Sequence, residues 1–225
     1  SWARSRKNYQ KYWLQMIELH SKGWAVFGRR GSGKSWFVKS LLETTPDHYI
    51  YDPLEEHKGY NRYRPTNRES IEELNNVIRD VVDPTTGGIR VTKDNQHRFP
   101  TRRVGEKWNP ELFVIDESNR YIFPHPAKIP QPVANLIDFQ RHYSLSFGVV
   151  ARRMTQVPTT LVELADHVFV FNLPGANDYQ KLESMYRGLG DEVRNLPPYH
   201  FVRLSHGSEI TVHAPIRPPS HPNET

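Results

Sequence analysis

An eight-residue stretch near the start of the chain, GRRGSGKS, constrains the fold more than any other part of the sequence. It matches the pattern G-x-x-x-x-G-K-[ST], with Gly28, Gly33, Lys34 and Ser35 at the fixed positions. Glycines allow backbone N–H groups to curl around an anion, because no Cβ stands in the way. The stretch therefore predicts a phosphate-binding loop.

The residues on either side of this loop supply the strand and the helix that it requires. The apolar run 24–27 predicts a buried strand, and apolar residues recur at helical spacing over residues 35–42. The N-terminus of that helix would point its positive dipole end at the same anion. The structural alternative is a glycine turn between a strand and a helix, with no ligand.

We expect the loop to bind a nucleoside triphosphate together with Mg²⁺. Lys34 is expected to reach the β- and γ-phosphates, and the Ser35 hydroxyl is expected to ligate the metal. The nucleotide-contacting residues are expected to be those of the loop and of the first helical turn: Gly28, Arg29, Arg30, Gly31, Ser32, Gly33, Lys34, Ser35 and Trp36.

A second strong signal is the apolar run 112–115, which ends in Asp116 and Glu117. A buried strand with this ending delivers two carboxylates to the carboxyl edge of a parallel sheet. Asp116 can hold Mg²⁺ through water, and Glu117 can act as the general base for an attacking water. The pair favours hydrolysis over a kinase reaction, in which phosphate passes to a bound acceptor. For Glu117 alone, the structural alternative is a partner of a helix N-cap.

Strand and helix patterns alternate along most of the chain, which predicts an α/β fold with a mostly parallel central sheet flanked by helices. Two short apolar runs on either side of His206-Gly207 predict a C-terminal β-hairpin. The remaining predicted strands are 48–51, 89–91, 146–151 and 166–171, and the predicted helices are 69–82, 133–143, 159–165 and 178–187.

Composition narrows the class of protein. The 225 residues suffice for one domain with a sizeable core. The chain has no cysteine, which excludes disulfides and thiolate metal sites. Its net charge of +5 is compatible with a polyanionic partner such as nucleic acid. No apolar run approaches the about 20 residues that a bilayer-spanning helix needs, and no signal peptide is evident.

The chain divides into three predicted parts. Residues 1–21 predict a basic amphipathic helix, either packed on the edge of the domain or serving as an arm that contacts another subunit or DNA. Residues 22–213 are expected to form the nucleotide-binding domain. Residues 214–225 are rich in proline and predict an extended tail.

Three further features each have two interpretations. Asp52 ends a predicted strand at the carboxyl edge of the sheet, where it either caps a turn or helps to position Mg²⁺ or water. Residues 54–67 interleave tyrosines with arginines, which suits base stacking and phosphate contact as well as an ordinary solvated loop. Cations crowd residues 90–107, which either track a phosphate backbone or form a solvated connection.

The order of these motifs resembles that of the FtsK–HerA superfamily of DNA-pumping P-loop ATPases. The resemblance is strongest to its viral genome-packaging branch and to the related Zot-type proteins of filamentous phages. It covers about residues 22–172. Its most specific parts are the two nucleotide motifs and the stretches RMTQVP (153–158) and LADH (164–167).

The resemblance implies a RecA-like ASCE core, in which one inserted strand separates the Asp-Glu strand from the strand before the loop. It also implies a ring, usually hexameric, with ATP between subunits and double-stranded DNA through the centre. By the same resemblance, Asp116 is the Mg²⁺-side acid and Glu117 the catalytic base.

The resemblance leaves the roles of the arginines open. Arg141 maps to the arginine finger of the family, which stabilises transition-state charge in a neighbouring subunit's site. Its alternative role is that of a cation at a helix C-terminus. Relatives carry a polar sensor, usually Gln, at the end of the fourth strand, where this chain has Arg153. The sensor role therefore falls to Arg153, Arg152 or Gln156, and the predicted catalytic residues are Lys34, Glu117, Arg141 and Arg153.

The function expected from the sequence is Mg²⁺-dependent ATP hydrolysis that moves double-stranded DNA into a viral capsid. The expected partners are double-stranded DNA, further copies of the chain in a hexameric ring, and capsid or portal-vertex proteins. The expected location is the host cytoplasm, with or without association to the virion. The alternatives are DNA transfer or export, as in conjugation or filamentous phage assembly, and a binding protein switched by nucleotide.

Overall fold

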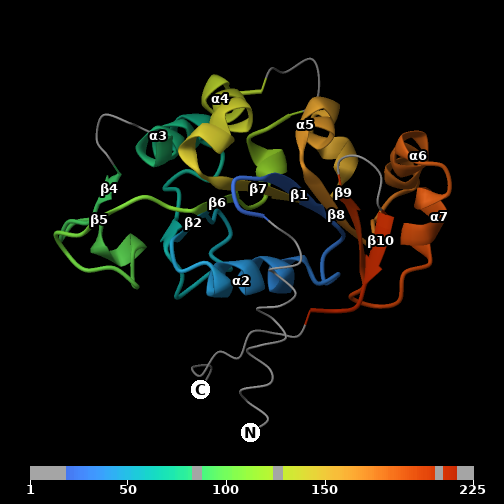
Figure 1. Cartoon of the computed structure of the whole chain (residues 1–225), viewed down its shortest axis with the longest axis horizontal. Helices are drawn as coiled ribbons and strands as arrows, with labels where there is room; N and C mark the ends of the chain where they lie inside the picture. Colours follow the sequence, from blue (N-terminus) through green and yellow to red (C-terminus); the bar gives the residue numbers. More distant parts are fainter. Residues whose placement is uncertain (1–18, 83–87, 124–128, 206–209, 217–225) are drawn as a thin grey trace, which may run out of the picture.

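β1 (Gly23–Phe27), the strand that leads into the glycine-rich loop, lies in the interior of an eight-stranded sheet. All five of its residues are buried, and it pairs with a parallel strand on each side (Figure 1). The strand order is β10-β9-β8-β1-β7-β6-β2-β3. The structure is a computed structural model, and it describes residues 19–82, 88–123, 129–205 and 210–216.

Six neighbouring strands, from β8 to β3, pair in parallel, and the hairpin of β9 and β10 completes the sheet. β7 lies between β1 and β6, so that one strand separates the loop strand from the Asp-Glu strand, as predicted. β9 runs antiparallel to β8, and β10 runs antiparallel to β9, which forms the predicted C-terminal hairpin. The other strands of the sheet are β2 (His48–Tyr51), β3 (Arg62–Tyr63), β6 (Leu112–Ile115), β7 (Ser146–Ala151), β8 (His167–Phe171), β9 (Phe201–Ser205) and β10 (Ile210–His213).

Helices cover both faces of the sheet. α2 lies on one face, and α3, α4 and α5 lie on the other (Figure 1). The α-helices are α2 (Lys34–Thr44), α3 (Ile71–Val82), α4 (Gln131–Phe139), α5 (Thr159–Leu164), α6 (Ala176–Met185) and α7 (Leu189–Arg194). Short 3-10 turns are η1 (Gln96–Arg98), η2 (Ser118–Arg120), η3 (Gln140–Tyr143) and η4 (Met154–Gln156), and a separate two-stranded sheet pairs β4 (Ile89–Arg90) with β5 (Lys107–Trp108).

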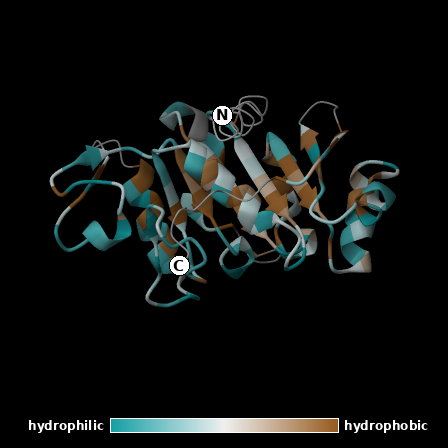
Figure 2. Ribbon diagram, turned by 90° about the horizontal axis from the view of Figure 1, so that it is seen from below, coloured by the Kyte–Doolittle hydropathy of each residue, from teal (hydrophilic) through white to brown (hydrophobic). Residues whose placement is uncertain are grey.

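The alternation of side chains along β1 divides the core into two layers. Trp24 and Val26 pack with the apolar face of α2, whereas Ala25 and Phe27 belong to the larger cluster under α3, α4 and α5. Figure 2 shows the hydrophobic residues gathered along the strands and the hydrophilic ones on the outer loops. Because both faces are covered, the parallel strands read as continuous apolar runs.

The parallel arrangement of the strands determines which edge of the sheet can carry a ligand-binding site. The carboxyl ends of β1, β2, β6 and β7 meet at one edge of the sheet. The residues that follow these strands are Gly28, Asp52, Asp116 and Arg152. Ligands of open α/β sheets bind at this edge.

Several elements differ from the prediction. Residues 54–67 contain the two-residue edge strand β3, which is too short to leave a periodic signal in the sequence. β5 pairs with β4 in a stretch predicted as an irregular connection. The predicted helix 178–187 begins earlier and ends at Met185, and α7 follows a turn at Gly188.

Parts of the predicted domain organisation lie outside the described residues. These include the amphipathic helix expected in residues 1–21, of which only residues 19–21 are described, and most of the proline-rich tail. Within the described ranges, no helix combines the length and the apolar character needed to cross a membrane.

The contact between Gly148 and Trp24 generates a stability prediction. A Cβ at Gly148 would overlap the ring of Trp24, a side chain that is 2% exposed. Gly148→Ala is therefore expected to lower the free energy of unfolding by about 1–3 kcal/mol, measured by chemical denaturation. The control is Gln180→Ala on the exposed surface of α6, expected to change it by less than about 0.5 kcal/mol. Wild-type stability of Gly148→Ala would contradict this packing.

Candidate active site

The loop between β1 and α2 has the backbone that an anion cradle needs. Gly31 and Gly33 have φ values of 74° and 111°, in the left-handed region that favours glycine. A Cβ at Gly28 would lie 2.6 Å from Phe171 Cβ and from Ser32 Oγ. Ser32 Oγ is buried and has no hydrogen-bond partner among the described residues. An orphaned hydroxyl inside a glycine turn at a helix N-terminus fits a phosphate group.

Lys34 shows that the loop faces the acidic pair. Its ammonium donates a hydrogen bond to the Arg29 carbonyl at 3.1 Å. Burial lowers the pKa of Lys34, and the nearby carboxylates of Asp116 and Glu117 oppose this shift. Both carboxylates therefore lie within electrostatic reach of Lys34, on the same side of the sheet.

β6 brings Asp116 and Glu117 to this edge with different environments. Asp116 is 7% exposed; its Oδ2 lies 3.0 Å from His57 Nε2, and its Oδ1 accepts the Glu117 N–H at 2.9 Å. Glu117 adopts a φ of 48°, which is uncommon for a residue with a side chain and marks a constrained position. Its Oε1 accepts a hydrogen bond from Arg152 Nε at 2.9 Å.

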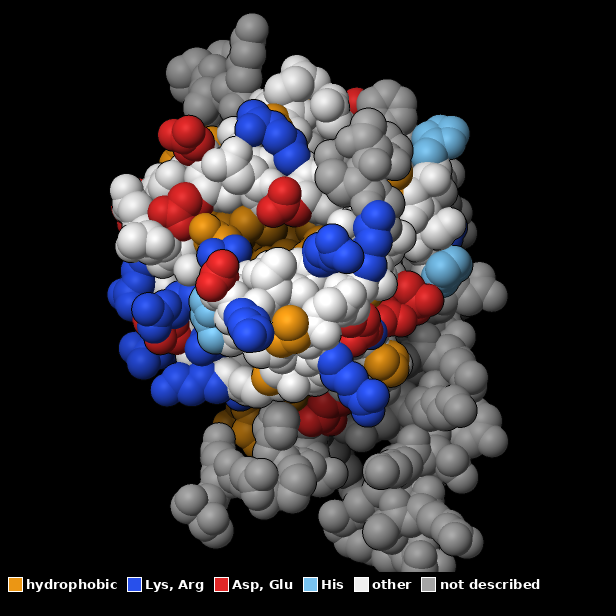
Figure 3. Space-filling view, turned by 90° about the vertical axis from the view of Figure 1, so that its left-hand side faces the viewer, with side chains coloured by type: hydrophobic (Ala, Val, Ile, Leu, Met, Phe, Trp, Pro, Cys, Tyr) orange, Lys and Arg blue, Asp and Glu red, His pale blue; other side chains and the backbone are white. Residues whose placement is uncertain are grey.

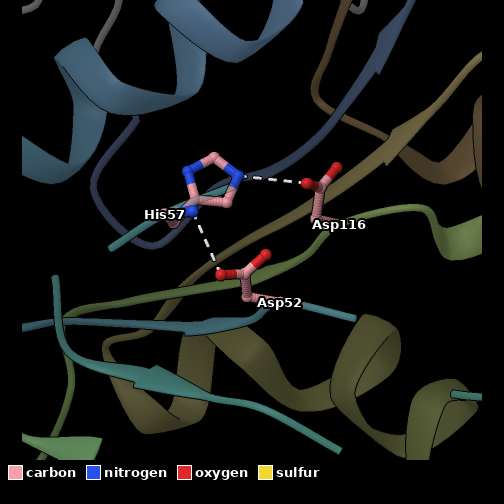
Figure 4. A group of neighbouring side chains, drawn as sticks. All are labelled: Asp52, His57 and Asp116. Carbon is pink, nitrogen blue, oxygen red and sulfur yellow. Dashed lines mark hydrogen bonds and ion pairs between the residues drawn. The ribbon is translucent and has the colours of Figure 1, made fainter. Parts of the chain in front are cut away.

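The loop after β2 contacts both residues predicted to hold the metal. Ser35 Oγ donates to Glu56 Oε2 at 3.2 Å, and His57 contacts Asp116. Asp52, which is fully buried, accepts the backbone N–H group of His57 at 3.0 Å (Figure 4) and that of Glu56, also at 3.0 Å. Asp52 therefore caps the turn, which is one of its two predicted roles.

The oxygens present fit a hard divalent cation. The Ser35 hydroxyl and the Asp116 carboxylate are oxygen ligands of the kind that Mg²⁺ prefers. Ser35 follows the loop after β1, and Asp116 follows β6. Both strands end at the edge of the sheet where Lys34 lies. Ser35 and Asp116 are thus the residues that would hold Mg²⁺ here.

The two arginines after β7 have different partners. Arg152 bonds Glu117, whereas Arg153 Nε donates to Asp178 Oδ2 at 2.9 Å. Asp178 is fully buried in α6 and also accepts the N–H and hydroxyl of Thr155. The structure therefore brings Arg152, and not the predicted Arg153, to the acidic pair, because Arg153 is held by Asp178.

The other predicted site residues are divided between exposed and undescribed positions. Arg29, Arg30 and Trp36 are exposed beside the phosphate loop, and Gln156 is exposed in η4. Arg141 belongs to η3, and its side chain lies outside the part of the chain that the structure describes.

The tyrosines of residues 54–67 pack inward. Tyr60 is 5% exposed and donates to Glu43 at 3.2 Å. Tyr63 stacks on Tyr51 with ring centroids 5.5 Å apart and donates to Glu73 at 3.1 Å. The base-stacking interpretation of this stretch is therefore wrong for these two rings.

The basic stretch 90–107 is partly neutralised by its own fold. Arg102 pairs with Asp47 and Glu106 and stacks over Trp108 at 4.5 Å. Arg98 lies over the ring of Tyr63, 4.7 Å from its centroid. The other basic residues of the stretch are open to solvent, at the end of the molecule that carries β4 and β5 (Figure 3). These exposed residues are Arg90, Lys93, His97, Arg103 and Lys107.

Sequence reasoning missed Glu56 and His57. The signal that could have found them is their place after Asp52-Pro53, a strand stop at the ligand-binding edge of the sheet. A carboxylate and an imidazole in such a loop are within reach of the phosphate-loop helix and of the neighbouring strand end.

Comparison with known proteins gives matches to structures only. No family model matches the chain, and no curated protein sequence matches it. The genome packaging NTPase B204 of Sulfolobus turreted icosahedral virus 2, in complex with ATP-gammaS, is 18% identical, with a TM-score of 0.63 over 87% of this chain and 98% of B204. B204 of Sulfolobus turreted icosahedral virus, a DNA-packaging ATPase, is 17% identical, with a TM-score of 0.63 over 88% and 99% of the two chains.

A more distant likeness is to a much larger protein. The cytoplasmic domain of the type VII secretion ATPase EccC of Thermomonospora curvata is 12% identical, with a TM-score of 0.54 over 86% of this chain and 25% of EccC. At these identities the likenesses concern the fold. They confirm the predicted RecA-like α/β fold with its mostly parallel, helix-flanked sheet.

The different partners of the two arginines predict different costs of removing them. Arg153→Ala is expected to lower the free energy of unfolding by about 1.5–3 kcal/mol, because the buried carboxylate of Asp178 loses its charged donor. The matched control is Arg152→Ala, whose partner Glu117 keeps 12% of its side chain exposed whereas Asp178 keeps none, with an expected loss below about 1 kcal/mol. Urea denaturation compares the two variants. Equal losses would contradict a structural role particular to Arg153.

Proposed function

We propose that this chain is an ATPase of the FtsK–HerA type, which hydrolyses ATP with Mg²⁺ to drive double-stranded DNA into a viral capsid. The observation that carries the proposal is that β1 and β6 end at the same edge of the sheet, which brings Asp116 and Glu117 near Lys34. The fold likeness to B204, a DNA-packaging ATPase, supports the same assignment.

Binding of the triphosphate is assigned to the loop and the first turn of α2. The N–H groups of the loop, the N-terminus of α2 and Lys34 would contact the phosphates, and the orphaned Ser32 hydroxyl would gain a partner. Ser35 and Asp116 would hold Mg²⁺, which neutralises charge on the phosphate oxygens when it is bound.

Hydrolysis is assigned to Glu117, with Arg152 as its partner. The Glu117 carboxylate would accept the proton of the attacking water. Arg152 bonds this carboxylate, and its guanidinium is the kind of group that binds phosphate oxygens. A terminal phosphate that draws Arg152 away would free Glu117 to act as a base. Arg152 is therefore our choice for the sensor among the three predicted residues.

The proposed working form is a ring of copies, with six as the expected number, around the DNA. The exposure of Arg29, Arg30 and Trp36 beside the phosphate loop supports a site that a neighbouring subunit completes. In that ring, Arg141 would act as the arginine finger of the adjacent site. Capsid or portal-vertex proteins would be the partners that receive the DNA.

Substitution of the two central residues separates binding from hydrolysis. Lys34→Ala is expected to abolish nucleotide binding or turnover, because the phosphates lose their cation. Glu117→Gln is expected to retain ATP binding but to lose at least about a hundredfold in turnover, because it cannot accept a proton. Equilibrium binding of ATP and release of phosphate measure the two quantities. Unchanged turnover in Glu117→Gln would remove it from the role of base.

Salt dependence tests the DNA part of the proposal. DNA binding is expected to weaken steeply with salt, because contacts with phosphates release counterions. The double variant Lys93→Ala with Arg103→Ala is expected to reduce the slope of log affinity against log salt by about 2. The control is Lys39→Ala with Arg187→Ala, which removes the same charge away from β4 and β5. Equal slopes for all three proteins, measured by fluorescence anisotropy, would contradict DNA contact at this end.

A further inference from the structure

Two adjacent residues of the loop between β2 and β3 each contact one of the residues that would hold Mg²⁺. Glu56 accepts the Ser35 hydroxyl at 3.2 Å, and His57 Nε2 lies 3.0 Å from Asp116 Oδ2. Because a carboxylate oxygen only accepts, His57 is the donor in that pair. One short loop thus contacts both residues that would hold Mg²⁺.

Asp52 holds this loop in place. Its Oδ1 accepts the Glu56 N–H, and its Oδ2 accepts the His57 N–H and a charged hydrogen bond from Arg62 at 2.7 Å. Asp52 and His57 are 0% and 1% exposed. A carboxylate with three donors in a buried position fixes the backbone of Glu56 and His57, and so the direction of both side chains.

The three buried residues are not a metal cage of their own. Ligand atoms of Asp52, His57 and Asp116 lie within 4.8 Å of one another (Figure 4). The Asp52 oxygens, however, already accept three hydrogen bonds, one of them from the cationic Arg62. His57 Nε2 is already paired with Asp116 Oδ2, at 3.0 Å. The cluster therefore orients a ligand and does not supply a second metal site.

We propose that Glu56 and His57 are positioning residues of the Mg²⁺ site assigned above, with Asp52 as their anchor. Glu56 accepts the hydrogen bond of the Ser35 hydroxyl and so would leave the oxygen lone pairs of Ser35 available to a metal. His57 contacts Oδ2 of Asp116 and so would fix the plane of the carboxylate that is assigned to the metal. Partners that orient metal ligands in this way commonly change metal affinity by about 10- to 100-fold when they are removed.

The proposal rests on the proposed function, and its test measures metal affinity rather than turnover. The probe is Mn²⁺, titrated into protein saturated with ATPγS and followed by electron paramagnetic resonance. Glu56→Ala and His57→Phe are expected to weaken Mn²⁺ binding by about 10- to 100-fold. Binding of ATPγS in EDTA is expected to change less than about twofold, because neither residue contacts the phosphate loop backbone.

Two control variants test whether a loss of Mn²⁺ affinity is specific to Glu56 and His57. Glu55→Ala removes the preceding acidic residue, which pairs with Arg64 and Arg68 and with neither metal residue, and it is expected to leave Mn²⁺ affinity unchanged. His57→Gln, which retains a donor, is expected to recover part of the affinity lost in His57→Phe. Glu56 is exposed, so its replacement tests the proposal even where His57→Phe fails to fold.

A double variant tests whether the effect of Glu56 on Mn²⁺ affinity passes through Ser35. In a Ser35→Ala background, Glu56→Ala is expected to cause no further loss of Mn²⁺ affinity, because its effect passes through the missing hydroxyl. Wild-type Mn²⁺ affinity in Glu56→Ala, or an equal loss in Glu55→Ala, would overturn the proposal. Absence of any Mn²⁺–ATPγS complex in the wild-type protein would instead overturn the proposed function.

Discussion

The electrostatic attraction between Lys34 and the nearby carboxylates of Asp116 and Glu117, which raises the pKa of Lys34 against the effect of burial, is the interaction on which the proposed chemistry depends. Burial alone would favour the neutral form of Lys34, and the two carboxylates favour the charged form. A triphosphate entering the loop would add negative charge beside the same ammonium. These charges support the proposed binding of an anion and a divalent cation together.

The fold provides this contact through ordinary packing. β1 is held between β7 and β8, and the absence of a Cβ at Gly148 leaves room for the ring of Trp24 beside β7. The parallel register aligns Phe27 with Ala151 and Val149 with Ile115, so that the strand ends arrive at one edge. Phe171 at the end of β8 closes the loop from the other side by packing against Gly28 and Gly33. Hydrophobic strands thus fix the positions of polar residues that follow them.

The sequence alone was sufficient for the fold and for the residues that local patterns define. The loop from Gly28 to Ser35 and the pair Asp116–Glu117 follow apolar runs, and their meeting is a consequence of a parallel sheet. Partners that depend on distant segments could not be read in this way. Arg152 and Arg153 are neighbours in sequence, yet one bonds Glu117 in the site and the other bonds Asp178 in α6.

The same limit applies to the loop after β2. The sequence predicted that its tyrosines could stack on bases. Their burial depends on Glu43, Tyr51 and Glu73, which lie on other elements of the fold. The contacts of Glu56 and His57 likewise required the placement of α2 beside β6. The spacing of residues in the sequence does not indicate a side-chain partner that lies on a distant element.

A structure of the protein with bound Mg²⁺ and ATPγS is the most direct test of the convergent site. We predict that the terminal phosphate lies at hydrogen-bonding distance from Lys34, with Mg²⁺ between Ser35 and the Asp116 carboxylate and Glu117 facing the terminal phosphorus across a water. A nucleotide bound at the loop with both carboxylates out of reach of its phosphates and metal would contradict the proposed hydrolysis.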